Sequence, residues 1–445
     1  MNKKTITIML AYVGVLTGAG LASGQELMQY FVSLGLKGMV GISIVAVLHM
    51  LIGGVLLILG SHYLATDHSD VFSKITNQVI SKFMDFSLIF TCFVIGFVMI
   101  AGAGSNLNQA FGVNINVGRV ICALMIVIVG MMDFDKVSKI IGSFTPFIVV
   151  LSLIGGIYTF TTADINWQDL DNFARTLPSN FNSLSLTVLN YFGMCLMTAV
   201  SMGFVLGGDE LASEDAGRGG LLGGAIAGIM GIIIAFTLFI RIEDVYSLDI
   251  PMLEIIKEIN PYLGIFMALI IFGMIFNTGI SLFYALARRF SKGEEKRFRL
   301  MLIGLTLVGF ILSFAGFKKL VSIFYPIIGY VGIFMIGLLV YAYFKERQEI
   351  KKESLKRVGI KHYMRKKLDE DVEFTENDEF RLKRLISSSH IDNKEMLEKA
   401  EETVQEEIDA ENEDYDIEDI KEDISDLKEE ISKLKEEIDL LKEGK

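Results

Sequence analysis

Residues 11–31 read AYVGVLTGAGLASGQELMQYF, an apolar stretch that changes character halfway along its length. Glycines and polar side chains interrupt it at Gly18, Gly20, Ser23, Gly24, Gln25 and Glu26. In a membrane helix each glycine costs about 1 kcal/mol relative to alanine, and a central glutamate costs about 3 kcal/mol. We therefore predict that the helix unwinds over residues 18–22. A second helix would begin at Ser23, where Ser23 and Glu26 match the S-x-x-E capping box.

The rest of the chain is apolar enough to supply further membrane helices. Of its 445 residues, 52% are hydrophobic, and the mean hydropathy of +0.48 exceeds what a soluble core of this size needs. A bilayer requires about 20 apolar residues per helix, because each backbone polar group must be paired within the segment. The expected spans are 5–34, 39–60, 83–104, 117–132, 140–161, 184–206, 219–240, 261–287, 298–315 and 318–344.

Charge predicts the orientation of these spans. An even number of spans places both termini on one side, and basic residues are more frequent on the side of the N-terminus, above all at 288–299. We therefore predict cytoplasmic termini in a bacterial cytoplasmic membrane. No convincing cleavage site follows the initial MNKK before Tyr30, so we expect the first span to be retained rather than removed as a signal peptide.

Motifs of catalytic and metal centres are missing from the sequence. It contains no HExxH, P-loop or zinc-ligand spacing and no nucleophile triad. Cys92, Cys122 and Cys195 lie inside apolar stretches without shared spacing, and we interpret them as small lipid- or core-facing residues. We expect neither an enzyme nor a cofactor beyond a coupling ion, and no nucleic-acid partner.

Two local matches relate the halves of the apolar region. Residues 23–27 (SGQEL) correspond to residues 207–211 (GGDEL), and Met-Ile with a later glycine recurs at 99–104 and 274–279. The matches join spans one and six and spans three and eight, which run in opposite directions. The sequence therefore predicts an all-α integral membrane fold with ten transmembrane helices in a 5+5 inverted repeat, of which helices 1 and 6 are broken.

Residues 18–26, GAGLASGQE, resemble the GAGxASGQE signature of the bacterial YkvI-like membrane proteins. These proteins are placed in the amino-acid permease (APC) superfamily, which has the LeuT-type fold, and the resemblance covers about residues 5–344. It implies that the backbone N–H groups of residues 18–20 face a substrate carboxylate. It also implies that the break in helix six faces this site and that a sodium ion lies between helices one and eight.

Several side chains are candidates for a transport site, each with a simpler structural interpretation. Glu26 either caps the backbone at Ser23 or binds a proton or substrate. Ser201 and Phe204 are either pocket residues or packing. The expected substrate-binding residues are Gly18, Ala19, Gly20, Ser23, Gln25, Glu26, Ser201, Phe204, Gly207 and Gly208.

Ion coupling and gating have their own candidates. Thr278 and Ser281 share one helix face, so with Asn277 they either bond their own helix or supply hard oxygen ligands to sodium. We favour sodium over protons, because the fifth span has no central lysine to replace the ion. Ala19 and Glu26 complete the coupling set, and Asp209 and Glu210 form either a gate or a solvated helix end.

The tail differs from the apolar region, 1–344. Residues 345–445 hold 21 Lys and Arg and 33 Asp and Glu, which accounts for the whole net charge of −12. We expect residues 345–416 to be a linker, basic and then acidic, that is partly disordered or helical. Residues 417–443 carry Ile and Leu at every a and d position, with Lys at e and acids at g. This heptad pattern predicts a parallel coiled coil that forms a homodimer; a single solvated helix or an added zipper is the alternative.

The sequence is compatible with two functions. The first is a secondary transporter of a small zwitterion, such as an amino acid, coupled to sodium or protons by alternating access. The second is a transporter-like membrane sensor that signals through its dimeric tail. A purely structural scaffold would explain the tail but not the interrupted helices.

Overall fold

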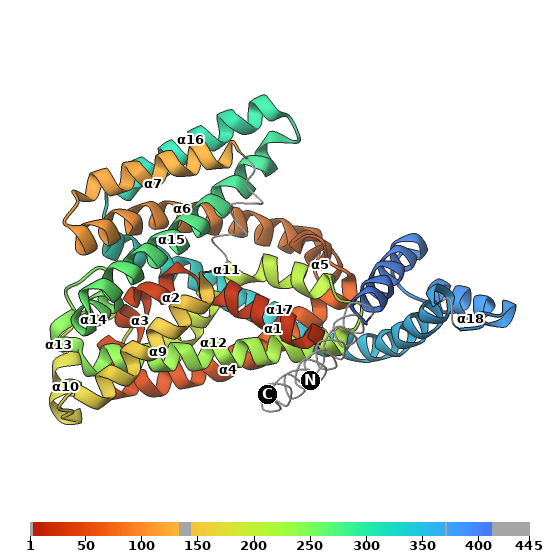
Figure 1. The fold of residues 1–445 in the computed structure, drawn as a ribbon, viewed down its shortest axis with the longest axis horizontal. Helices are drawn as coiled ribbons and strands as arrows, with labels where there is room; N and C mark the ends of the chain where they lie inside the picture. Colours follow the sequence, from red (N-terminus) through yellow and green to blue (C-terminus); the bar gives the residue numbers. More distant parts are fainter. Residues whose placement is uncertain (1–2, 133–143, 370–371, 412–445) are drawn as a thin grey trace, which may run out of the picture. The chain divides into compact units, whose positions relative to one another are not determined.

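The computed structural model describes residues 3–132, 144–369 and 372–411, and every element within them is a helix (Figure 1). The predicted coiled coil at 417–443 lies outside the described residues. The chain divides into two compact units, Met1–Arg347 and Gln348–Lys445.

Seven described helices are long and apolar enough to cross a membrane, and α1 and α7 are shorter apolar helices. Val40, Val47 and Leu51 of α4 are at least half exposed, as expected of side chains that face lipid. The seven helices are α4 (Leu36–Tyr63), α6 (Gln78–Phe111), α9 (Thr145–Thr162), α11 (Leu184–Gly208), α12 (Ser213–Ile240), α15 (Pro261–Ser291) and α17 (Phe317–Leu368). The shorter helices of this unit are α5 (His68–Ile75), α7 (Ile115–Gly130), α10 (Trp167–Ala174), α13 (Ile242–Val245), α14 (Pro251–Ile259) and α16 (Glu295–Ser313).

The first expected span is interrupted twice. It is divided into α1 (Lys3–Leu16), α2 (Ala19–Ser23), α3 (Gln25–Tyr30) and the 3₁₀ turn η1 (Val32–Leu34). Gly24 has a φ of 80°, in the left-handed region that glycine adopts without strain. The interruption is therefore present, but residues 19–22, which we expected to be unwound, are helical, and the breaks lie at Thr17–Gly18 and at Gly24.

The predicted capping box at Ser23 and Glu26 is wrong. Because Gly24 changes the direction of the chain, Ser23 lies at the end of α2 and α3 begins at Gln25. The Ser23 hydroxyl donates to the carbonyl oxygen of Gly20 at 2.8 Å and accepts from the N–H of Gln25 at 3.2 Å. The Glu26 carboxylate is thereby free to point elsewhere.

The predicted break in the sixth span is also wrong. α11 continues without interruption to Gly208 and ends at Asp209, and the next helix begins at Ser213. A Cβ atom at Gly207 would lie 2.3 Å from the carbonyl oxygen of Leu57, and one at Gly208 would lie 2.1 Å from that of Ala65. These glycines therefore permit the close approach of α11 to α4 and the turn after it, rather than unwinding the helix.

Glycines also form the contact between α4 and α12, which lie along one another (Figure 1). A Cβ atom at Gly220 would lie 2.4 Å from the carbonyl oxygen of Gly53, and one at Gly224 would lie 2.1 Å from that of His49. The two backbones thus approach each other closely, as small residues allow in membrane helices. On the other side of the unit, α7 and α16 pack on α6 and α15 (Figure 1).

The second unit is helical where we expected a linker that is partly disordered or helical. It contains residues 348–368 of α17, α18 (Glu376–Ser387) and a helix at 393–411. Its buried apolar side chains are Ile350, Ile360, Met364, Leu382, Ile386, Ile391, Met396, Ala400 and Val404. The basic face of α17 pairs with the acidic helix, for example through Lys361 and Glu407 at 2.7 Å.

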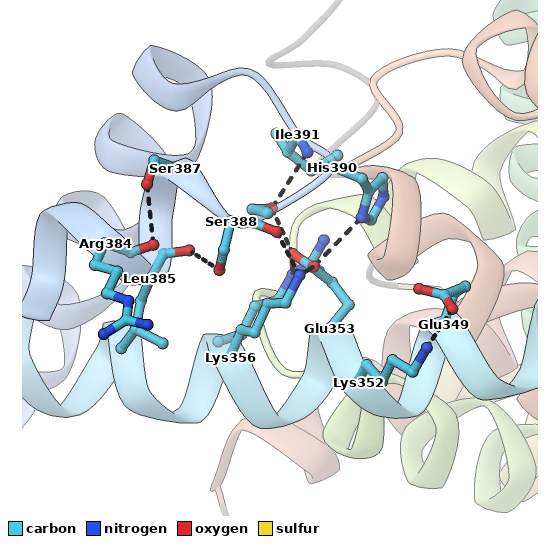
Figure 2. Close-up of polar contacts among 12 residues, drawn as sticks. Glu349, Lys352, Glu353, Lys356, Arg384, Leu385, Ser387, Ser388, His390 and Ile391 are labelled. Atoms are coloured by element: carbon cyan, nitrogen blue, oxygen red, sulfur yellow. Dashed lines mark hydrogen bonds and ion pairs between the residues drawn. The ribbon is translucent and has the colours of Figure 1, made fainter.

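Glu353 is the buried polar centre of this unit (Figure 2). Its carboxylate accepts a hydrogen bond from Ser389, forms ion pairs with Arg357 at 3.4 Å and Lys356 at 3.4 Å, and lies 3.5 Å from Nδ1 of His390. Burial alone would raise the pKa of Glu353, but the hydrogen bonds from His390 and Ser389 and the charge of Arg357 hold that pKa well below its usual range. The carboxylate therefore remains ionised and joins α17 to the 387–391 turn.

Candidate functional site

A cavity of about 810 Å³ lies inside the first unit, next to the first break. Its wall takes residues from the broken first span and from α4, α5, α6, α11, α12, α15 and α17. Most of the lining side chains are apolar, with a small number of polar groups among them. This combination and volume are typical of a site for a small molecule.

Glu26 is the buried carboxylate of this cavity. It is 7% exposed and lies beside the side chains of Tyr325 and Tyr191. Gly20 makes room for it, since a Cβ atom there would lie 1.4 Å from Glu26 Oε1. The glycine of α2 and the glutamate of α3 therefore depend on each other, and the two tyrosines flank the carboxylate from α11 and α17.

The first break brings backbone N–H groups to the same wall. Gly18 is extended, with φ −67° and ψ 178°, and both Gly18 and Gly20 line the cavity. Within the described residues neither of their N–H groups donates to a backbone carbonyl. They thus remain available to an acceptor in the cavity.

Two hydroxyl groups on α15 are also available. Thr278 and Ser281 line the cavity and have no hydrogen-bond partner among the described residues. By contrast, the hydroxyl group of Thr91 on α6 lines the same cavity but donates to the carbonyl oxygen of Ser87 at 2.8 Å. Bonding to its own helix is the usual state of a membrane threonine, so the two α15 hydroxyls stand out as potential ligands.

A charged cluster lines another part of the cavity. His68 of α5 contacts Ser201 of α11 at 3.0 Å through Nδ1 and Asp85 of α6 at 3.1 Å through Nε2. Arg289 of α15 forms an ion pair with the same Asp85 carboxylate. Asp67, His68, Ser201 and Arg289 all line the cavity. The cluster therefore ties four helices together beside the space that a ligand would occupy.

Polar side chains of α3 and α6 form hydrogen bonds with the 246–250 turn and with the start of α17. Gln109 of α6 pairs with both the N–H and the carbonyl of Ile250, at 3.1 and 2.9 Å, and Ser105 donates to Asp249 at 2.6 Å. Gln29 donates to the carbonyl oxygen of Lys318 at 3.0 Å. These bonds fix the 246–250 turn and the start of α17 against α3 and α6.

Sequence comparisons place the chain beside two proteins of Bacillus subtilis (strain 168). It is 24% identical to the uncharacterized membrane protein YkvI over 337 residues, which cover 75% of this chain and 94% of YkvI. It is 23% identical to the uncharacterized protein YyaD over 335 residues, or 74% of this chain and 94% of YyaD. No protein-family model matches.

Comparison with solved structures identifies the fold. MhsT in complex with L-phenylalanine superimposes with a TM-score of 0.58 at 13% identity, covering 90% of this chain and 99% of MhsT. Mhp1 in its inward-facing conformation gives a TM-score of 0.52 at 11% identity, covering 92% of this chain and 94% of Mhp1. The chain is similar to the YkvI membrane protein and has the LeuT fold. With its apolar helices, it is a multi-pass membrane protein.

In this YkvI-like chain, the cavity includes only some of the residues expected from the sequence. Gly18, Gly20, Glu26, Ser201, Thr278 and Ser281 line it. Ala19 contributes the first residue of α2. The cavity lining does not include Ser23, Gln25, Phe204, Gly207, Gly208, Asp209, Glu210 and Asn277.

The excluded residues have structural surroundings that explain their positions. Gln25, with its amide oriented to suit its neighbours, donates to the carbonyl oxygens of Leu248 and Asp249. Phe204 is fully buried against Phe72. Glu210, expected at a gate with Asp209, accepts a hydrogen bond at its carbonyl from Ser61 at the turn after α11.

Sequence reasoning missed other lining residues of the cavity. Tyr191, Cys195, Tyr325, His49, His68 and Arg289 line it. Tyr191 and Cys195 are four residues apart and therefore share a face of α11, but the same spacing is also typical of core packing. His49 carried the one usable signal, because a histidine is rare in an apolar span. A packed side chain is, however, the simpler interpretation of a solitary histidine.

Proposed function

We propose that this protein is a secondary transporter that moves a small zwitterionic solute, an amino acid, across the bacterial cytoplasmic membrane by alternating access. The observation that carries the proposal is the position of Glu26, a buried carboxylate that shares a cavity wall with the N–H groups of Gly18 and Gly20. A carboxylate accepts hydrogen bonds from an ammonium group, and free backbone N–H groups donate to a carboxylate. One wall thus offers complementary partners for both charged groups of an amino acid.

The remaining cavity surface suits the rest of such a solute. Leu21, Ile95, Met99 and Met194 give it apolar walls, and its volume lies in the upper part of the range of about 300–1,000 Å³ for small-molecule sites. MhsT, which has the same fold, is described in complex with L-phenylalanine. These facts support an amino acid over a larger or more highly charged solute.

We propose that transport is coupled to sodium, because the two hydroxyl groups of α15 are suited to bind this ion. Thr278 and Ser281 would supply two neutral oxygen ligands, and their lack of other partners among the described residues fits that role. Among the described residues, no group of three His, Cys, Asp or Glu side chains suits a transition metal. Protonation of Glu26 is the alternative source of coupling.

The proposal includes the ten-helix architecture expected from the sequence, a 5+5 inverted repeat with both termini in the cytoplasm. Two linkages support alternating access between its halves: the charged cluster of His68, Asp85 and Arg289, and the amide bonds that fix the 246–250 turn. Each would open in one of the two states. Dimerisation through residues 417–443 belongs to the same proposal.

Uptake into proteoliposomes tests the transport function. We expect the purified protein to accumulate at least one radiolabelled amino acid, and accumulation to rise with an inward sodium gradient. Glu26→Gln should reduce uptake at least about tenfold, because a neutral amide does not replace the charge that faces an ammonium group. Glu254→Gln in α14 is the matched control and should transport normally. The proposal fails if no amino acid is accumulated or if Glu26→Gln is without effect.

A sensor is the second candidate, favoured by one observation. The second unit has its own buried core and a buried ion cluster at Glu353, which a passive tail would not need. An amino acid that raises the melting temperature of the protein but is never accumulated in proteoliposomes would support the sensor instead.

A further inference from the structure

His49 is an unusual side chain for the middle of an apolar helix. It lies on α4, is 8% exposed, lines the cavity, and presents its ring to Phe192 with the centroids 4.9 Å apart. Its imidazole has no hydrogen-bond partner among the described residues. His68, by contrast, contacts a partner through each ring nitrogen.

Packing alone does not account for His49. A phenylalanine would fill a similar space, whereas an imidazole held among apolar groups loses its hydrogen bonds to water. That loss is removed if a molecule in the cavity bonds to the ring. The position of His49 on the cavity wall makes such a bond possible.

The surroundings of His49 are apolar. Ile42, Val45 and His49 recur on one face of α4, and Ala227 and Gly231 of α12 lie on the same cavity wall. Gly231 adjoins Ile42, since a Cβ atom there would lie 3.5 Å from its side chain. We call this part of the cavity, formed by Ile42, Val45, His49, Ala227 and Gly231, the α4–α12 chamber. His49 is its single polar side chain.

The other polar side chains of the cavity belong to other helices. Apart from Glu26, they are Asp67 and His68 at α5, Thr91 on α6, Tyr191, Thr198 and Ser201 on α11, Thr278, Ser281 and Arg289 on α15, and Tyr325 on α17. The groups suited to the ends of an amino acid are Glu26 and the N–H groups of the first break. The α4–α12 chamber is therefore left for a bulky side chain that carries one hydrogen-bonding group.

We propose that His49 determines substrate specificity by hydrogen bonding to the polar tip of an amino-acid side chain held in the α4–α12 chamber. The substrate class is then an amino acid whose side chain is large, mostly apolar and terminated by one hydrogen-bonding group, as in tyrosine. A neutral imidazole has one donor and one acceptor nitrogen, so it can pair with a hydroxyl in either direction. The inference rests on the proposed transport function and names its substrate class.

The test compares L-tyrosine with L-phenylalanine, which differ by one hydroxyl group. Binding to the full-length protein in detergent is measured by calorimetry. We expect tyrosine to bind about tenfold more tightly, the size of effect that one good hydrogen bond produces. His49→Phe should abolish this preference by weakening tyrosine binding alone, and His49→Gln, which retains a donor and an acceptor, should restore part of it. A misfolded variant would bind neither ligand, so the ratio of the tyrosine and phenylalanine affinities reports specificity rather than folding.

A second variant tests the chamber itself. Val45→Phe would place a large side chain one turn from His49, so we expect it to weaken both tyrosine and phenylalanine while leaving alanine binding unchanged. Equal affinities of the parent for tyrosine and phenylalanine would overturn the inference, as would a preference that survives in His49→Phe or unaltered tyrosine binding to Val45→Phe. These outcomes leave amino-acid transport intact. If the parent binds and transports no amino acid, the proposed function fails and this inference fails with it.

Discussion

Gly18 and Gly20 are two residues apart in the same break but have different surroundings. No atom lies within 4 Å of a Cβ built on Gly18, whereas one on Gly20 would overlap the Glu26 carboxylate. Gly20→Ala should therefore force Glu26 from its tyrosine partners and lower the stability of the protein by about 1–3 kcal/mol. Gly18→Ala is the matched control and should leave stability within about 0.5 kcal/mol. Thermal unfolding in detergent measures both, and equal stabilities would contradict the packing of Glu26 on Gly20.

A larger residue at position 18 should abolish amino-acid binding without affecting the folding of the protein. The open space around Gly18 accommodates Gly18→Leu, so the melting temperature should stay close to that of the parent. The leucine side chain would cover the N–H groups of the break, and amino-acid binding should be lost. Binding that survives Gly18→Leu, measured by calorimetry, would place the carboxylate site elsewhere.

The free hydroxyls of α15 give a prediction about the coupling ion. Thr278→Ala together with Ser281→Ala should abolish the sodium dependence of amino-acid binding, because two oxygen ligands are removed. Thr91→Ala is the control, since its hydroxyl also lines the cavity but already bonds to Ser87. Titrations of amino-acid binding with and without sodium compare the double variant with this control. An unchanged sodium response in the double variant, or none in the parent, would move the coupling to protons and Glu26.

Between elements, glycines set how closely the helices of the first unit approach. Gly224 of α12 faces the α4 backbone, whereas a Cβ atom at Gly304 of α16 meets nothing within 4 Å. Gly224→Ala should therefore cost about 1–3 kcal/mol of stability through overpacking. Gly304→Ala should be neutral or stabilise by up to about 1 kcal/mol, because alanine favours the helix. If thermal unfolding ranks the two variants in the opposite order, the close contact between α4 and α12 is wrong.

The charged cluster beside the cavity is also a property of several elements. His68, Asp85, Ser201 and Arg289 come from α5, α6, α11 and α15, which are far apart in the sequence. None of these residues has a motif of its own. Their contact arises only when the four helices pack around the cavity, which is why the sequence did not indicate it.

At the scale of the whole molecule, the second unit should respond to pH through Glu353. The folded state holds the pKa of this carboxyl below its usual value, so its stabilising effect is fully present above the unfolded pKa of about 4.3. That effect is lost as the pH falls through the lower folded pKa. Hydrogen exchange of residues 348–411 in the full-length protein should therefore show protection at neutral pH that declines in acid below about pH 4.

Removing the charge at neutral pH should have a related effect. Glu353→Gln removes the carboxylate charge that pairs with the buried Arg357, so we expect the second unit to lose about 3 kcal/mol of stability. The matched control is Glu349→Gln, because Glu349 pairs with Lys352 at an exposed position one turn earlier (Figure 2). Hydrogen exchange at residues 348–411 that is equally slow in both variants would show that the buried cluster does not hold the unit together.

Dimerisation through residues 417–443 is a prediction from the sequence alone. Lys428→Glu with Lys435→Glu would set acids against acids across the expected parallel coiled coil and should weaken dimerisation, most strongly at low salt. Cysteine cross-linking at position 431 in membranes measures the dimer. If the parent itself fails to cross-link, residues 417–443 form no such dimer.

The amino-acid sequence by itself determined the apolar helices, the interruption at residues 18–26 and the resemblance to YkvI-like proteins. These follow from composition and local spacing, because lipid requires long apolar helices and glycine beside a glutamate disfavours a continuous one. The tertiary structure decided which glycines break a helix and which allow close packing: Gly24 adopts a left-handed conformation, whereas Gly207 and Gly208 lie against the α4 backbone and the turn that follows it. It also decided that Glu26 faces Tyr191 and Tyr325 and that His49 lines the cavity, because helical periodicity predicts that a side chain is buried but not which distant residue it meets.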